Sequence, residues 1–180
     1  MRNALPVVAL LAAGLVTAST ASAAPAEPAS ELPRTVSSTT TPVPGELRVP
    51  DGQDLVLTAR VEQGAQVYTC AGGAWALLEP AAVLRSGGTV VLHTKGPQWI
   101  SPADGSAVTG TAVASVPVTG AVPQLLLKST ANRGTGLFGS VDYIQRLNTN
   151  GGVAPAGQCT EGALQAVPYY AEYRFYEAST

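Results

Sequence analysis

The side chains best suited to acid–base chemistry are concentrated between residues 93 and 106. His93 is the only histidine in the chain and stands between an apolar segment and the Gly96-Pro97 turn. Asp104 and Ser106 follow closely, so the three residues could form a Ser-His-Asp hydrolase site with His93 as the base. The chain has no Gly-x-Ser-x-Gly nucleophile motif, and its Asp-Gly-Ser run is typical of a turn. The hydrolase is therefore the second choice.

A structural role is the alternative for His93. An imidazole beside a turn can hydrogen-bond a nearby backbone carbonyl and hold the turn in place, and this interpretation is favoured over catalysis. A glycosidase would need two carboxylates at a defined separation, and the spacing of the acidic residues selects no such pair. The sequence thus favours a protein that is not an enzyme.

Polar and aromatic residues beside the same turns predict a ligand-binding mouth. Trp99 follows the Gly-Pro turn, and its ring could stack on a sugar or another flat ligand. Gln145, Arg146 and Asn148 are unusually polar for an apolar segment, and they either line a pocket or satisfy buried backbone groups. The residues expected to face the ligand are His93, Trp99, Asp104 and Gln145, whereas Trp75, Tyr169, Tyr173 and Phe175 are expected in the core.

Metal and dinucleotide sites are not predicted. One histidine cannot supply a histidine-rich zinc or copper site, and the sequence has no Asp-rich calcium loop. Gly134-x-Gly136-x-x-Gly139 has the spacing of a dinucleotide-binding motif, but that motif requires a helix after the last glycine. Strand formers dominate the residues that follow. The three glycines are therefore expected in a turn between two strands, and no cofactor is predicted.

A period of two in the apolar residues predicts an all-β fold. Leu57, Ala59 and Val61 alternate with more polar neighbours, and a similar alternation recurs over residues 169–176. Glycine pairs and Asp-Gly steps indicate tight turns, including a hairpin at Gly72-Gly73. The expected architecture is an antiparallel β-sandwich or barrel with short strands and little helix.

The N-terminal residues predict export. Arg2, the apolar run that follows it and the Ala-Ser-Ala sequence at residues 21–23 form the pattern of a signal peptide over residues 1–23. Residues 24–45 are rich in Pro, Ala, Ser and Thr and are expected to be a disordered leader, followed by a single β-rich domain over residues 46–180. The expected location is secreted or extracellular, or periplasmic in a bacterium with two membranes.

Cysteine count and charge narrow the partners further. Cys70 and Cys159 are expected to form a disulfide in an exported chain, which would add roughly 4–5 kcal/mol for a loop of about 90 residues. The alternative is that the two cysteines bind a metal ion as thiolates, but such a site would need more ligands than the single histidine supplies. Loss of Arg2 with the signal peptide would leave a net charge of about −3 and no basic run. Nucleic acid and anionic membranes are therefore not expected partners.

Five segments occur in an order that resembles a known family: GAQVYTC (64–70), HTKGPQW (93–99), DGSAVTG (104–110), VDYIQRLNTNGGVAPAGQC (141–159) and YYAEYRFY (169–176). Together they look like a family of secreted bacterial and fungal proteins catalogued as a domain of unknown function. Some fungal members carry a malate dehydrogenase label, which this chain does not support because no helix is expected after its glycine motif. The resemblance covers essentially the whole mature domain. It implies export and a β-rich fold, and it implies no established activity.

Taken together, these features predict a non-catalytic binding or structural module at or outside the cell envelope. The expected ligand is a carbohydrate or another small molecule. A small secreted hydrolase that uses His93 as its base is the alternative, and a purely structural coat protein is a third possibility. Convergence of the site residues on a concave pocket would distinguish a binding module from a coat protein.

Overall fold

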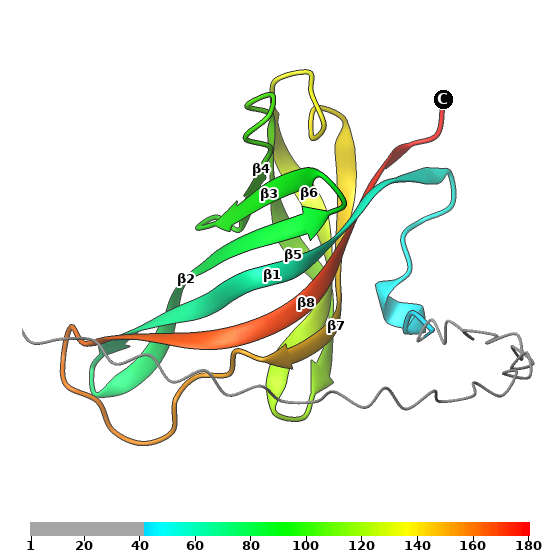
Figure 1. Ribbon diagram of the computed structural model, residues 1–180. Coiled ribbons are helices and arrows are strands. Elements are labelled where there is room, and N and C mark those ends of the chain that lie inside the picture. Colours follow the sequence, from blue (N-terminus) through cyan, green and yellow to red (C-terminus); the bar gives the residue numbers. More distant parts are fainter. Residues whose placement is uncertain (1–41) are drawn as a thin grey trace, which may run out of the picture. The chain divides into compact units, whose positions relative to one another are not determined.

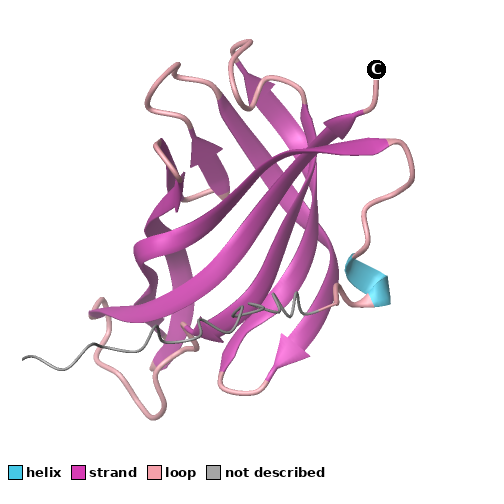
Figure 2. Ribbon diagram, turned by 45° about the vertical axis from the view of Figure 1, so that its right-hand side comes forward, coloured by secondary structure: helices cyan, strands magenta, loops and turns pink. Residues whose placement is uncertain are grey.

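A computed structural model describes residues 42–180, so the predicted signal peptide and most of the predicted leader lie outside the described residues. Eight antiparallel strands follow one another around a single closed barrel (Figure 1). The all-β prediction is confirmed, and the barrel is the alternative that forms. The helical structure of the described residues is one 3-10 turn (Figure 2). The elements are η1 (Gly45–Leu47), β1 (Gln53–Ala71), β2 (Ala74–Ser86), β3 (Thr89–Thr94), β4 (Gln98–Ile100), β5 (Ala107–Val118), β6 (Ala121–Arg133), β7 (Val141–Gly151) and β8 (Leu164–Ala178).

Strand length differs from the expectation of short strands. β1 has 19 residues and β8 has 15, whereas β3 and β4 have only 6 and 3. β1 continues through Gly64 despite two register shifts in its pairing with β2, with Glu62 as the extra residue of β1 in the first and Leu78 as the extra residue of β2 in the second. The first shift also changes which residues face inward, from Val61 before it to Gln66 and Tyr68 after it.

Alternate residues of the strands fill the barrel interior with one large hydrophobic core. On β8 the inward residues include Tyr169, Tyr173 and Phe175, as predicted. Trp75 was expected in the core and is instead partly exposed, because it directly follows the hairpin turn at one end of β1 and β2. Trp99 is the tryptophan that enters the core, with 1% of its surface exposed.

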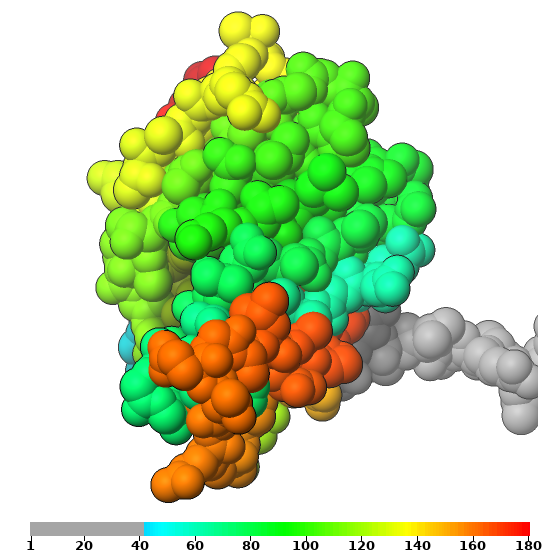
Figure 3. Space-filling view, turned by 90° about the vertical axis from the view of Figure 1, so that its left-hand side faces the viewer, coloured from blue at the N-terminus to red at the C-terminus, as the bar shows by residue number. Residues whose placement is uncertain are grey.

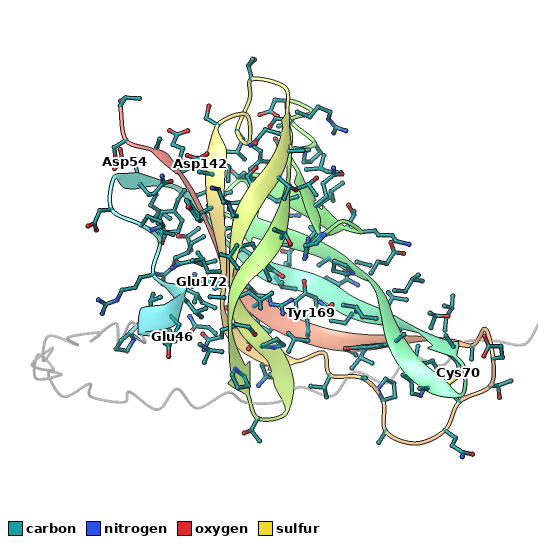
Figure 4. The ribbon with its side chains drawn as sticks, turned by 180° about the vertical axis from the view of Figure 1, so that it is seen from behind. Glu46, Asp54, Cys70, Asp142, Tyr169 and Glu172 are labelled. Atoms are coloured by element: carbon teal, nitrogen blue, oxygen red, sulfur yellow. A yellow bond between two sulfur atoms is a disulfide. The ribbon has the colours of Figure 1, made fainter. Side chains whose placement is uncertain are left out.

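A second, smaller core lies where η1 covers the sheet. Leu47 of η1 is fully buried and packs with Leu126 of β6 and Leu147 of β7. Figure 4 shows η1, with Glu46 labelled, beside the strands that it covers. Successive residues of β7 therefore have different surroundings, with one side of the strand facing the barrel interior and the other facing η1.

The barrel wall is open beside the two short strands. β3 pairs with β2 only over residues 82–86 of β2, and β4 pairs with β5 only over residues 107–109 of β5. β3 ends and β4 begins at the Lys95–Pro97 turn, and neither strand extends beyond it. No paired strand therefore separates the first half of β2 from the later part of β5. We call this opening the window, bordered by residues 77–80, 95–97 and 109–112. The β2, β3 and β5 side of the barrel faces the viewer in Figure 3.

The Cys70–Cys159 disulfide forms as predicted, with the two Cα atoms 5.8 Å apart. It joins the end of β1 to the loop that precedes β8. The backbone N–H of Cys70 donates to the carbonyl of Ala163 at 2.9 Å, and the N–H of Gly162 donates to the carbonyl of Cys70 at 3.0 Å. In Figure 4, Cys70 and Asp54 lie at opposite ends of β1.

The prediction that the glycine motif forms a turn between two strands is confirmed. Gly134, Gly136 and Gly139 lie in the loop between β6 and β7, and both neighbours of this loop are strands. A helix that could receive a pyrophosphate at its N-terminus does not follow Gly139. Within residues 42–180, the helical structure is also too short to span a membrane.

Candidate ligand-binding site

His93 and Trp99 lie opposite each other on β3 and β4. Their rings are stacked, with centroids 4.5 Å apart and planes at 4°. The ring of Tyr173 meets His93 edge-on, at a centroid distance of 5.2 Å. The structure thus brings together two of the four residues that the sequence predicted to face a ligand.

His93 is held as a neutral imidazole. Burial lowers its pKa to about 3; the hydrogen bond to Gln98 opposes this effect, and the positive charge of Arg146 adds to it. The Nδ1 atom lies 3.0 Å from the carbonyl oxygen of Gln98. Because a carbonyl can only accept, Nδ1 carries the proton and Nε2 is left as an acceptor. This is the turn-holding contact that the structural interpretation of His93 expected.

In the alternative hydrolase site, Asp104 and Ser106 bond each other and the loop before β7, and His93 bonds neither of them. The carboxylate of Asp104 accepts from the backbone N–H groups of Ser106 at 2.8 Å and Leu137 at 3.0 Å. These bonds, that of Leu137 foremost, hold the pKa of Asp104 below its usual range. The Ser106 hydroxyl is fully buried and accepts from the N–H of Phe138 at 3.0 Å. His93 is bonded to its own turn, and an imidazole with so low a pKa is a weak base at neutral pH.

Gln145 faces away from His93 and Trp99. Its Nε2 donates to the carbonyl of Leu47 in η1, and its Oε1 accepts from the hydroxyl of Tyr176 at 2.8 Å. Gln145 therefore satisfies a buried backbone group, which is one of the two alternatives that the sequence left open.

The expected mouth of four converging residues needs correction. His93 and Trp99 share a site, whereas Asp104 joins two loops and Gln145 supports η1. Gln145 faces away from the barrel interior because side chains alternate along a strand, and its neighbour Arg146 takes the inward position on β7. Arg146 pairs with Tyr173 of β8, which belongs to the core inside the barrel.

The window opens into a cavity of about 580 Å³, a size typical of small-molecule sites. Apolar residues of β2, β5 and β6 form much of its lining, among them Pro80, Ala112 and Leu127. The polar and charged side chains that border it include Gln66, Glu79, His93, Lys95 and Arg146. An apolar cavity with a few polar groups is the usual composition of a ligand site.

Gln66 is a buried polar residue of this lining whose side-chain amide lacks a good hydrogen bond. It is 1% exposed, and its Nε2 makes no hydrogen bond of good geometry among the described residues. A weaker contact joins its side chain to Tyr169 and acts to lower the pKa of that tyrosine. A buried donor left without a partner costs about 1–3 kcal/mol. Because Gln66 borders the cavity, a molecule in the cavity that carries an acceptor could satisfy this amide.

Arg146 is the second polar residue of the cavity that the sequence did not select. Its Nε donates to the carbonyl of Pro123 at 3.0 Å, and its side chain is partly exposed. Its side chain hydrogen-bonds Tyr173, and its positive charge acts to lower the pKa of four residues on the inner side of the barrel. These residues are Tyr68, His93, Tyr169 and Tyr173.

A signal for both residues was present in the sequence. Gln66 shares its side of β1 with Tyr68 and Cys70, so a polar residue stands in an inward series. Arg146 is two residues after inward-facing Ile144 on β7, so strand alternation places it on the same side. Choosing between Gln145 and Arg146 required knowledge of which side of β7 faces the interior.

A second hollow, of about 740 Å³, is lined by β1, β2 and β3 together with Pro168 and Tyr169. It shares His93 with the window cavity. The charged residue in its lining is Glu62, which is paired with Arg85. The window cavity is the stronger candidate because it contains the amide of Gln66 and the guanidinium of Arg146. Residues 42–180 contain no group of three or more His, Cys, Asp or Glu side chains placed to hold a metal ion.

Comparison with known proteins gives one match. The model of a family described as "Protein of unknown function (DUF3455)" matches residues 50–177. No curated protein and no solved structure matches the chain. The matched segment includes the window, the disulfide and nearly all of the barrel.

Proposed function

The chain belongs to the DUF3455 family of proteins of unknown function, and we propose that it is a non-catalytic binding module that takes a small molecule into the window cavity. The amide of Gln66, which borders the cavity and makes no hydrogen bond of good geometry among the described residues, is the observation that carries this proposal. A purely structural barrel would gain stability from an apolar residue at this position, because it would avoid a buried unsatisfied donor.

The contacts of His93 favour binding over hydrolysis. Its Nδ1 is used by the turn, and its stacked partner Trp99 fixes the plane of the ring. Asp104 and Ser106, which the hydrolase would require, bond backbone groups of a loop instead. In the proposed module, His93 presents Nε2 as a fixed acceptor at the edge of the cavity.

The proposal places this module outside the cytoplasm. The disulfide supports that location, because such bonds persist mainly in oxidising compartments. The signal-peptide pattern over residues 1–23 also supports it, although those residues lie outside the described part of the chain.

A fluorescent dye tests whether the cavity accepts a ligand. N-phenyl-1-naphthylamine is uncharged, and its emission rises when it leaves water for apolar surroundings. We expect the dye to bind the full chain at one site. Ala112 lies opposite the inward residue Leu127, so Ala112→Trp would fill the window and weaken binding by at least about tenfold, the effect of losing roughly 1.4 kcal/mol.

Ala76→Trp is the matched control, because Ala76 is an exposed residue of β2 that does not line the cavity. This variant should bind the dye as the wild type does. Absence of dye binding by the wild type would contradict the proposal. Equal binding by the wild type and by Ala112→Trp would place the dye elsewhere and would contradict it as well.

A further inference from the structure

The charges that border the window cavity are unbalanced. Arg146 and Lys95 are positive, Glu79 is negative, and buried His93 is neutral. The lining therefore has a net positive charge, although the whole chain has a formal net charge of −2. A positive lining within an acidic protein is a local property of this site.

Arg146 has no carboxylate partner among residues 42–180. The ion pairs of this part of the chain involve Arg60, Arg85 and Arg174. The Nε of Arg146 donates to the carbonyl of Pro123, and the Arg146 side chain also hydrogen-bonds Tyr173. A guanidinium has five N–H donors, so donors remain for a molecule in the cavity beyond these two contacts.

Gln66 and Arg146 supply two donor side chains to the lining of the cavity. The hydroxyls of Tyr169 and Tyr173 lie 3.3 Å apart and bond each other, and they also contact Gln66 and Arg146 respectively. A ligand that takes up the remaining donors of Gln66 and Arg146 must bring acceptors, and a charged oxygen group is the strongest acceptor for arginine.

The remaining lining requires an apolar body. Leu77, Pro80, Leu125 and Leu127 border the cavity, and Leu77 is 56% exposed at its edge. A small inorganic anion would leave these surfaces in contact with water. A molecule with an apolar part would cover them and gain the free energy of their burial.

We propose that the ligand of the window cavity is a small amphipathic anion, with one negatively charged oxygen group held by Arg146 and Gln66 and an apolar body against β2 and β6. This inference rests on the proposed function, because it names the class of molecule that the same cavity binds. A neutral sugar is the ligand class that it disfavours.

Two dyes of nearly the same shape provide the test. 1-Anilinonaphthalene-8-sulfonate is N-phenyl-1-naphthylamine with one added sulfonate, so the pair differs by the charged oxygen group. For the full chain we expect the sulfonate to bind roughly 10- to 100-fold more tightly than the neutral dye, as charge-assisted hydrogen bonds imply. Arg146→Met should remove this preference.

Lys95→Met is the control for general electrostatic attraction. Lys95 is exposed at the border of the window, so its removal changes the charge equally without removing a contact inside the cavity. At physiological salt we expect Lys95→Met to retain most of the preference, because exposed charges are screened. An equal loss in Lys95→Met and Arg146→Met would overturn the role of Arg146.

Gln66→Met is a second variant that tests the inference even if Arg146→Met fails to fold. It removes an unpaired amide, so it should raise the midpoint of unfolding while it weakens the preference for the sulfonate. Equal binding of the two dyes by the wild type would overturn this inference and leave the proposed function standing. Failure of both dyes to bind would overturn the proposed function and this inference together.

Discussion

His93 is neutral because the fold places it between Trp99 and Tyr173 and excludes water from it. Burial disfavours the charged form of an imidazole, and this effect lowers its pKa to about 3 from an ordinary value of 6.5. In the unfolded chain the same residue regains its ordinary pKa. Stability therefore depends on pH through this residue.

The direction in which stability changes with pH follows from the pKa of His93 in the folded and in the unfolded chain. Below about pH 6.5 the unfolded chain binds a proton at His93 that the folded chain does not bind, so the free energy of unfolding falls as pH decreases towards 3. We expect a loss of up to about 1.4 kcal/mol per pH unit from this residue. His93→Asn keeps an N–H for the Gln98 carbonyl and cannot titrate. Urea unfolding of both proteins between pH 7.5 and 4.5 measures the difference.

Other titrating groups are common to both proteins, so the difference isolates His93. The stability of the wild type relative to His93→Asn should decrease with falling pH. A difference that stays constant over this range would show that His93 becomes charged as readily in the folded chain as in the unfolded one.

Two buried glutamines show how burial alone fails to indicate function. Gln145 is 2% exposed and has partners at both ends of its amide, one in η1 and one on β8. Gln66 is 1% exposed, and its Nε2 makes no hydrogen bond of good geometry among the described residues. The hydrogen-bond state separates a structural amide from a candidate ligand contact.

At the scale of elements, the loop before β5 is fastened to the loop before β7. The carboxylate of Asp104 accepts N–H groups from both loops, and Asn132 donates to the carbonyls of Phe138 at 2.7 Å and Val141 at 3.0 Å. Gly136 makes the close approach possible, because a Cβ atom there would lie 2.4 Å from the carboxylate of Asp104. Gly136 thus allows the two loops to pack closely against each other.

This arrangement predicts the effect of adding one methyl group. Gly136→Ala should displace the carboxylate of Asp104 and free the N–H groups of Ser106 and Leu137. Hydrogen–deuterium exchange should become faster in peptides that cover residues 101–106 and 134–139, while binding of the neutral dye stays unchanged. Thr135→Ala, at an exposed neighbouring position, is the control. Unchanged exchange in Gly136→Ala would show that Asp104 does not hold the two loops together.

At the scale of the whole molecule, strand β1 and the disulfide connect distant parts of the chain. β1 pairs with both β2 and β8, which closes the barrel. Cys70 and Cys159, 89 residues apart in sequence, tie the end of β1 to the loop before β8. A link of this length restricts the unfolded chain over much of the domain.

Removing the link should therefore lower global stability. The variant Cys70→Ala/Cys159→Ala should lose roughly 2–5 kcal/mol of unfolding free energy in urea. Wild-type protein treated with a reductant should unfold at a similar urea concentration, which controls for the two substitutions. A variant as stable as the oxidised wild type would show that the disulfide adds nothing to global stability.

The sequence by itself determined the properties that depend on near neighbours. The alternation of apolar residues predicted the strands, Gly72-Gly73 predicted their first hairpin, and the glycine motif was correctly assigned to a turn because strands stand on both sides of it. The Cys70–Cys159 pair followed from the number of cysteines. These inferences require only local geometry and simple counting.

Only the tertiary structure decided which residues meet in the site. The register shift after Val61 places Gln66 inward, and the pairing of β7 with β8 turns Arg146 to the interior and Gln145 to η1. The window exists because β3 and β4 end at the same turn while their neighbours continue. Each of these features depends on the register between segments far apart in the chain, and a shift of one residue would exchange the inner and outer faces.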